Sequence, residues 1–146
     1  MGLMIYGVYT FLAVFNAGTM TTLQIQHYGI YPFVGIDNFK AYMKANNKAA
    51  FIPAVLPGLL LHILSIVLLF IRPSFMTFPE VVASLALNVI AFVSTFKWQR
   101  PIQEDMANAG YNEEKVKILL STNWIRTIAF IILSIMTISV LIMAVS

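Results

Sequence analysis

The sequence predicts an all-α protein, an integral membrane antiparallel bundle of four helices. Hydrophobic residues make up 60% of the chain and charged residues 10%, whereas a soluble domain averages about 25% charged residues. The apolar residues form four runs, each about as long as a helix needs to cross a ~30 Å hydrocarbon core. Short loops join the runs, so we expect a single domain over residues 1–146, with spans at about 3–25, 49–71, 78–98 and 124–145.

The first run is expected to stay in the mature protein. No basic segment precedes it and no small-residue cleavage site follows it, as a signal peptide would require. After it, Pro32 disfavours helix at the preceding residue. Asp37 can then cap a short helix with one apolar face. That face, made of Phe39, Tyr42 and Met43, predicts an interfacial amphipathic helix.

The second run contains Pro53, Pro57 and Gly58 near its start. Proline removes a backbone hydrogen bond and clashes with the previous turn, so this spacing predicts a kink or a wide mouth at that end. The alternative is that prolines are simply common in membrane helices. The connection after Arg72 is short, which predicts a hairpin between spans two and three, with Pro79 in the first turn of span three.

A mixed-charge loop over residues 103–117 follows span three. Asn112, Glu113 and Glu114 are typical of a helix start, because acidic side chains interact favourably with its positive end. We expect a second short interfacial helix there, leading into span four. Both longer loops would then carry one short helix each.

The distribution of Lys and Arg predicts the orientation. Eight of the nine basic residues lie in or beside the two longer loops, and Arg72 alone lies on the opposite side. Positive charge in short loops marks the cytoplasmic side. We therefore expect both termini outside and the two longer loops in the cytoplasm of a cell whose inner (plasma) membrane holds the chain.

Polar residues recur on one side of three predicted spans, at 100° per residue. The stripes comprise Tyr9, Asn16, Gln24 and His27; Ser84, Asn88, Thr95 and Gln99; and Asn123, Thr127, Ser134 and Thr137. They converge on the cytoplasmic end, where amides, an imidazole, an aromatic ring and a guanidinium suit a small-molecule pocket. The candidate ligand-binding residues are Asn16, Gln24, His27, Asn88, Gln99, Asn123, Trp124 and Arg126. The alternative is that these polar groups only join helices, at about 0.6 kcal/mol each.

Several other site types are disfavoured. His62 lies about 12 residues into span two, hence ~18 Å from the level of His27 at ~1.5 Å per residue, so the two histidines do not suit one metal or haem. Glu80 is the only carboxylate within a span, and the chain has no cysteine. We expect no metal, no cofactor and no nucleic-acid partner, since the small net charge of +3 is a topology signal.

Three stretches carry a resemblance to known proteins: Leu120–Thr127, His27–Pro32 and Phe39–Tyr42. Together they resemble a set of small bacterial four-span membrane proteins and, more distantly, the anthrone oxygenase-like family. That family implies a four-helix membrane bundle that oxidises polycyclic phenols with dioxygen, without metal or flavin. The resemblance implies that Asn123, Trp124 and Arg126 bind a flat phenol at the cytoplasmic mouth, with His27 as the best candidate for a catalytic base.

The first functional hypothesis is therefore a membrane protein that binds a small lipophilic or aromatic molecule, with cofactor-independent oxygenation of a phenolic compound as the activity that the resemblance implies. The alternative is a non-enzymatic membrane subunit or assembly factor of a larger complex. Membrane lipids are expected partners in both cases, and the sequence leaves open a homodimer or another membrane partner. A transporter is disfavoured because charged residues are scarce within the spans.

Overall fold

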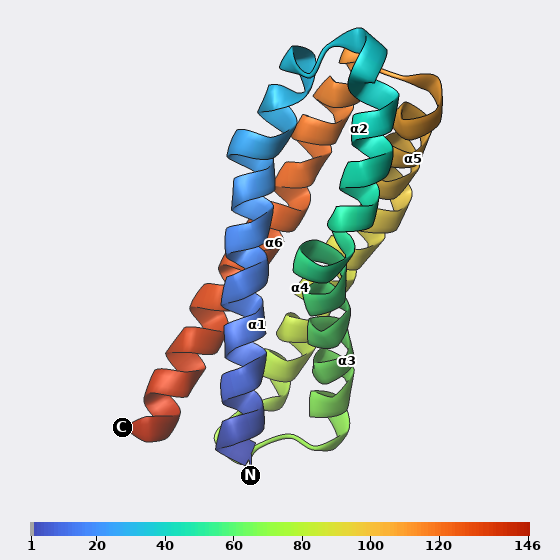
Figure 1. Cartoon of the computed structure of the whole chain (residues 1–146). Helices are drawn as coiled ribbons and strands as arrows, with labels where there is room; N and C mark the ends of the chain where they lie inside the picture. The colour runs from blue at the N-terminus through green and yellow to red at the C-terminus, as the bar shows by residue number, and fades with distance from the viewer. Residues whose placement is uncertain (1) are drawn as a thin grey trace.

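The computed structural model describes residues 2–146, and these residues form helices and short connections without a β-strand. Four helices are long and apolar enough to cross a membrane: Gly2–Phe33, Phe51–Phe70, Phe78–Ala109 and Glu113–Val145. This confirms the predicted all-helical class and the four long apolar helices. Figure 1 shows both termini at one end of the molecule, with α2 and α5 at the other.

The long helices are continuous, but three of them change their winding. α1 (Gly2–Thr22) continues through a π-helical turn at Leu23–His27 and a 3-10 turn at Tyr28–Phe33. A second π-helical turn, Phe51–Val55, leads into α3 (Leu56–Phe70). A third, Thr95–Gln99, joins α4 (Phe78–Ser94) to α5 (Arg100–Ala109). The two remaining helices are α2 (Ile36–Ala49) and α6 (Glu113–Val145).

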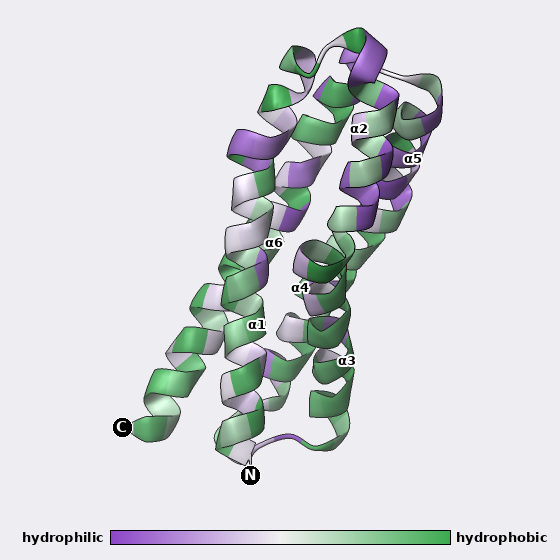
Figure 2. Cartoon of the chain, in the orientation of Figure 1, coloured by the Kyte–Doolittle hydropathy of each residue, from purple (hydrophilic) through white to green (hydrophobic). Residues whose placement is uncertain are grey.

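The four apolar helices pack as a closed ring. α6 contacts both α1 and α4, and α3 contacts both α4 and α1. Hydrophobic residues dominate these helices, whereas hydrophilic residues gather over α2 and α5 (Figure 2). The ring also encloses buried polar side chains, and its apolar core includes Tyr6, Leu61 and Leu133, each with no exposed surface.

Three helices extend beyond the predicted spans. The predicted loop over residues 103–117 is helical as far as Ala109, and α6 is one helix of 33 residues rather than a short helix followed by a span. Gly110, with a φ of 104°, ends α5 in a conformation that suits glycine. The side chain of Asn112 then accepts a hydrogen bond from the backbone N–H of Lys115 at 2.9 Å, which confirms the predicted start of this helix.

The expectation that Pro32 would prevent helix at Tyr31 is wrong. Pro32 lies inside the 3-10 turn Tyr28–Phe33. The fixed φ of proline is compatible with a 3-10 turn, so the chain tightens there instead of leaving the helix. Gly35, with a φ of 82°, then turns the chain into α2.

The apolar face of α2 lies inside the protein. Phe39 and Met43 have no exposed surface, and they form a second core with Tyr28, Tyr31, Met106, Ala107, Val116 and Leu119. α2 packs directly on α5. The predicted helix therefore exists, but its aromatic face contacts the extended ends of the long helices rather than a membrane interface. We call this packed end, residues 28–49 and 100–119, the cap.

The turn between α3 and α4 agrees with the sequence-based expectation. Pro79 lies in the first turn of α4. The Glu80 carboxylate accepts hydrogen bonds from the backbone N–H and the hydroxyl of Thr77, at 2.6 and 2.7 Å. These bonds fix the start of α4.

Candidate cavity at the junction of the helices and the cap

A cavity of about 1020 Å³ lies among the long helices, just below the cap. Its walls come from α1, from the Phe51–Val55 turn and α3, and from α4 and the Thr95–Gln99 turn, while α6 contributes Arg126 and Phe130. Most of the lining side chains are apolar. The volume is at the upper end of the range for small-molecule sites, which are concave and carry a few polar groups.

All three π-helical turns contribute to the cavity wall. Leu23 and His27 belong to the first, Phe51–Val55 supplies four lining residues, and the third supplies Thr95, Phe96 and Gln99. A π-helical turn re-aims the side chains that follow it, and such turns are frequent at functional sites. The predicted kink at Pro53 takes the form of the second of these turns, and Pro53 and Gly58 both line the cavity.

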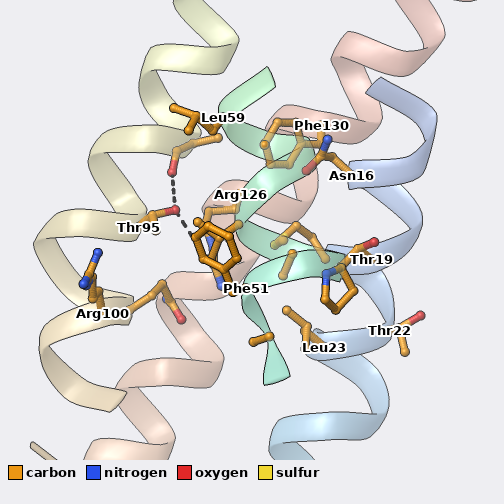
Figure 3. A pocket seen from close by; sticks show the side chains of 18 of the residues that line it. Asn16, Thr19, Thr22, Leu23, Phe51, Leu59, Thr95, Arg100, Arg126 and Phe130 are labelled. Carbon is orange, nitrogen blue, oxygen red and sulfur yellow. Dashed lines mark hydrogen bonds between the residues drawn. The ribbon is translucent and has the colours of Figure 1, made fainter. Parts of the chain in front are cut away.

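Arg126 is the only buried cation among the described residues. Its side chain is 6% exposed. Nε donates to Asn123 Oδ1 at 3.0 Å, Nη2 to the Tyr28 hydroxyl at 3.1 Å and also to Asn123 Oδ1, and Nη1 to Thr95 Oγ1 at 3.4 Å. A dashed line in Figure 3 marks the hydrogen bond between Arg126 and Thr95. Every acceptor of the guanidinium is therefore a neutral oxygen.

No carboxylate within residues 2–146 forms an ion pair with Arg126. The three salt bridges there join exposed or half-exposed side chains on α5 and the start of α6. A guanidinium has five N–H groups, and the contacts above use four of them, which leaves one N–H of Nη1 free. A buried charge without a counter-charge is costly to the fold, so an anion or a strong acceptor that reached this N–H would be held favourably.

A second layer of residues holds the guanidinium in place. Asn123 Nδ2 donates to Gln24 Oε1 at 2.8 Å and to the Met20 carbonyl at 3.3 Å, so the Oδ1 of Asn123 stays directed at Arg126. The Tyr28 hydroxyl also accepts from Gln103 Nε2 at 3.2 Å, which ties Arg126 to the cap. Such supporting hydrogen bonds pre-organise a binding group.

A separate polar cluster lies deeper in the ring, and we call it the central cluster: Tyr9, Ser65, Ser84 and Asn88. Asn88 Nδ2 donates to the Tyr9 hydroxyl at 3.1 Å, to Ser65 Oγ at 2.7 Å and to the Ser84 carbonyl at 3.0 Å. Tyr9 and Ser65 are also joined at 3.0 Å. Only neutral groups take part, and they link α1, α3 and α4.

His27 lines the cavity at its cap end and is half-buried. Its Nε2 is 3.3 Å from the Tyr31 hydroxyl, and its ring lies 5.6 Å from that of Tyr28. Since Tyr28 bonds to Arg126, Tyr28 connects the imidazole with the guanidinium. The other histidine, His62, also lines the cavity and stacks on Phe92 with ring centroids 4.8 Å apart.

The wall holds more hydrogen-bonding capacity than the chain uses. Seven buried side-chain atoms within residues 2–146 have no partner, and four belong to residues that line the cavity: Asn16 Oδ1, Asn47 Oδ1, His62 Nδ1 and Gln99 Oε1. Buried polar groups are normally paired. Their concentration around one cavity indicates a place for further polar partners. No group of three His, Asp or Glu side chains that could hold a metal ion lies together in the described chain.

The structure brings most of the predicted residues together, some in the wall of the cavity and others directly behind Arg126. Five line the cavity: Asn16, His27, Asn88, Gln99 and Arg126. Gln24 and Asn123 lie behind Arg126 and orient it. Trp124 is 47% exposed and does not line the cavity.

Other residues of the site were not singled out from the sequence. Tyr28 and Thr95 both accept from Arg126, and Gln103 and Phe130 line the cavity. Tyr28 directly follows His27, but a tyrosine near a span end is equally typical of a membrane interface. Thr95 belonged to a predicted polar stripe, and its helical spacing from Gln99 was the feature of the sequence that could have marked it as a site residue.

Comparison with family models, with curated proteins and with solved structures finds no match to this chain.

Proposed function

We propose that the four apolar helices cross a membrane as an antiparallel bundle, with both termini outside and the cap in the cytoplasm. Large apolar side chains such as Met4, Ile63 and Ile135 are exposed along the helices, at 71%, 47% and 62%. These surfaces suit lipid tails. The basic residues support the orientation, because eight of nine belong to the cap end of the chain.

We propose further that the cavity binds a small lipophilic molecule through one anionic or strongly accepting oxygen, which Arg126 holds. The observation that carries this is the buried guanidinium with neutral partners, no acidic partner and a free N–H in the wall of a largely apolar cavity. An ionisable residue at membrane depth is a functional-site hypothesis by default. The apolar walls supply affinity for the remainder of the ligand.

Oxidation of a flat phenol is the chemistry we propose for this site. Arg126 would stabilise the phenolate, and His27, across the Tyr28 ring from it, would accept the phenol proton. The electron-rich ring can then reduce dioxygen, so that one oxygen atom enters a quinone product and the other leaves as water. This step uses no group beyond the substrate, dioxygen and the side chains.

The binding proposal is tested with the fluorescent phenol 1-hydroxypyrene, titrated into purified protein in detergent. We expect Arg126→Gln to weaken binding by about tenfold or more, since a hydrogen bond to a charged group contributes about 1.5–3 kcal/mol. Arg72→Gln is the matched control, because it removes an exposed arginine far from the cavity. Equal affinity of the wild type and Arg126→Gln would rule out Arg126 as the binding group.

The oxygenase step needs its own measurement. Oxygen uptake with anthrone as substrate should exceed the uncatalysed rate for the wild type and fall to that rate for Arg126→Ala. Binding without any oxygen uptake would support a carrier or receptor of phenolic molecules, and equal uptake by both proteins would contradict the enzymatic proposal.

A non-enzymatic membrane subunit remains the second candidate, and one surface favours it. Isoleucines repeat along the outer side of α6 at helical spacing: Ile128, Ile132, Ile135 and Ile142 are 51%, 48%, 62% and 58% exposed. Partner helices and lipid both suit such a stripe. Native mass measurement in detergent separates the two, since co-purification with other chains would support the subunit.

A further inference from the structure

The cavity reaches the outer surface of the bundle between α1 and the second helix, because lining residues from both are exposed. On one side of the opening lie Phe15, Gly18, Thr19 and Thr22 of α1, and on the other Phe51, Val55 and Leu59. Phe15, Phe51 and Val55 are 39%, 54% and 47% exposed, so the rim is apolar and faces outward. Figure 3 shows Phe51 over Arg126, opposite Thr19 and Leu23.

The polar groups of this rim are already satisfied within α1. Thr19 Oγ1 donates to the Phe15 carbonyl at 2.9 Å, and Thr22 Oγ1 to the Gly18 carbonyl at 3.0 Å. A threonine paired in this way presents its methyl group outward and needs no water. The rim is therefore compatible with lipid along its whole length.

The cap side of the cavity is polar and cross-linked. Asn47 Nδ2 donates to the Gln103 carbonyl at 3.4 Å, and the side chain of Gln103 donates to Tyr28. At the same edge, Arg100 and Glu104 form an ion pair at 2.8 Å. A molecule that entered past Asn47 and Gln103 would have to part hydrogen bonds that join α2, α5 and Tyr28, whereas no hydrogen bond within the described residues joins the two sides of the lateral opening.

The winding of the second helix produces the opening. Pro53 has no N–H, and the Phe51–Val55 segment is a π-helical turn in which Val55 N–H bonds back to the Ala50 carbonyl at 3.3 Å. No polar side-chain contact joins this turn to α1 within the described residues. The turn and α1 can therefore separate without losing hydrogen bonds.

We infer that the ligand enters from the bilayer through the gap between α1 and the Phe51–Val55 turn, and so is a membrane-dissolved amphiphile. Its polar oxygen reaches Arg126, and its apolar part occupies the gap and the outer cavity. This rests on the proposed function, because it names the source and the orientation of the molecule that Arg126 binds. The basic cap end of the chain places the opening in the cytoplasmic leaflet.

The test measures how fast the protein takes up 1-hydroxypyrene from phosphatidylcholine vesicles that already contain it. Thr19→Phe places a ring in the opening, and we expect it to slow uptake by about tenfold, as a blocked access path does. Thr21→Phe is the matched control: its hydroxyl also bonds to the carbonyl four residues earlier, at 2.8 Å, but it does not line the cavity. Thr21→Phe should leave both the uptake rate and the affinity in detergent within about twofold of the wild type, whereas Thr19→Phe should slow uptake by a larger factor than it weakens affinity, since its ring obstructs the gap without touching Arg126.

A second variant keeps the test independent of how Thr19→Phe folds. Phe51→Ala opens the rim at a half-exposed position, and we expect faster uptake than in the wild type. Gln103→Ala loosens the cap side instead, because it removes the hydrogen bond to Tyr28. Unchanged uptake in Thr19→Phe and Phe51→Ala, or faster uptake in Gln103→Ala alone, would overturn the lateral route and leave the binding proposal intact. Absence of 1-hydroxypyrene binding to the wild type in detergent would instead overturn the proposed function, and the lateral route with it.

Discussion

The two buried polar clusters of this protein are built from similar residue types, but one is neutral and the other surrounds a positive charge. The central cluster joins Tyr9, Ser65 and Asn88 of three helices through neutral hydrogen bonds. The Arg126 cluster also uses amides and hydroxyls, but they surround a cation that has no acidic partner in the described chain. The comparison teaches that a polar stripe on an apolar helix can either hold helices together or hold a charge ready for a ligand.

Burial of the charge should cost stability, and this gives the largest expected effect. Arg126→Met replaces the guanidinium with an apolar side chain. We expect the unfolding temperature of the ligand-free protein to rise, because the variant removes the desolvation penalty of a buried charge without a counter-charge, which is on the order of several kcal/mol. Thermal unfolding followed by circular dichroism checks this. A large fall would show that Arg126 is mainly structural.

The central cluster should stabilise the fold, so that removing one of its hydrogen-bonding groups lowers stability. Tyr9→Phe removes the hydroxyl that contacts both Ser65 and Asn88, and we expect a loss of stability of about 0.5–1.5 kcal/mol. Affinity for 1-hydroxypyrene should change far less than in Arg126→Gln, because Tyr9 does not line the cavity and reaches its wall only through Asn88. A large loss of affinity would remove the distinction between the clusters.

The sequence predicted much of the fold because long apolar runs carry strong signals for helices. Long apolar runs, Pro79 in the first turn of α4 and the Asn112 start of α6 were all readable from residue type and position. The cap was not. The face of α2 that contains Phe39 has the composition of an interfacial helix, and only the tertiary fold shows that α5 and α6 cover it.

The site was predicted in part for a related reason. Helical periodicity placed Arg126 on the same side as Asn123, and the structure joins them. Periodicity assumes regular winding, whereas all three π-helical turns lie beside the cavity. Their rotation of the chain could not be read from spacing, and neither could the contact of Tyr28 with Arg126. The resemblance to the anthrone oxygenase-like family named Trp124, which lies on the outer surface.

The central claim is that the guanidinium of Arg126 binds the ligand. The most direct test gives this guanidinium an acidic partner within the protein. Asn123→Asp is nearly isosteric and places a carboxylate where Asn123 Oδ1 now accepts from Nε of Arg126 at 3.0 Å. We predict that this internal ion pair weakens binding of 1-hydroxypyrene by about tenfold or more, because the new carboxylate neutralises the guanidinium and so removes its attraction for the ligand oxygen. Asn46→Asp, which adds the same charge to a cavity residue with no bond to Arg126, is the control and should change affinity less. Unchanged affinity in Asn123→Asp would contradict the account.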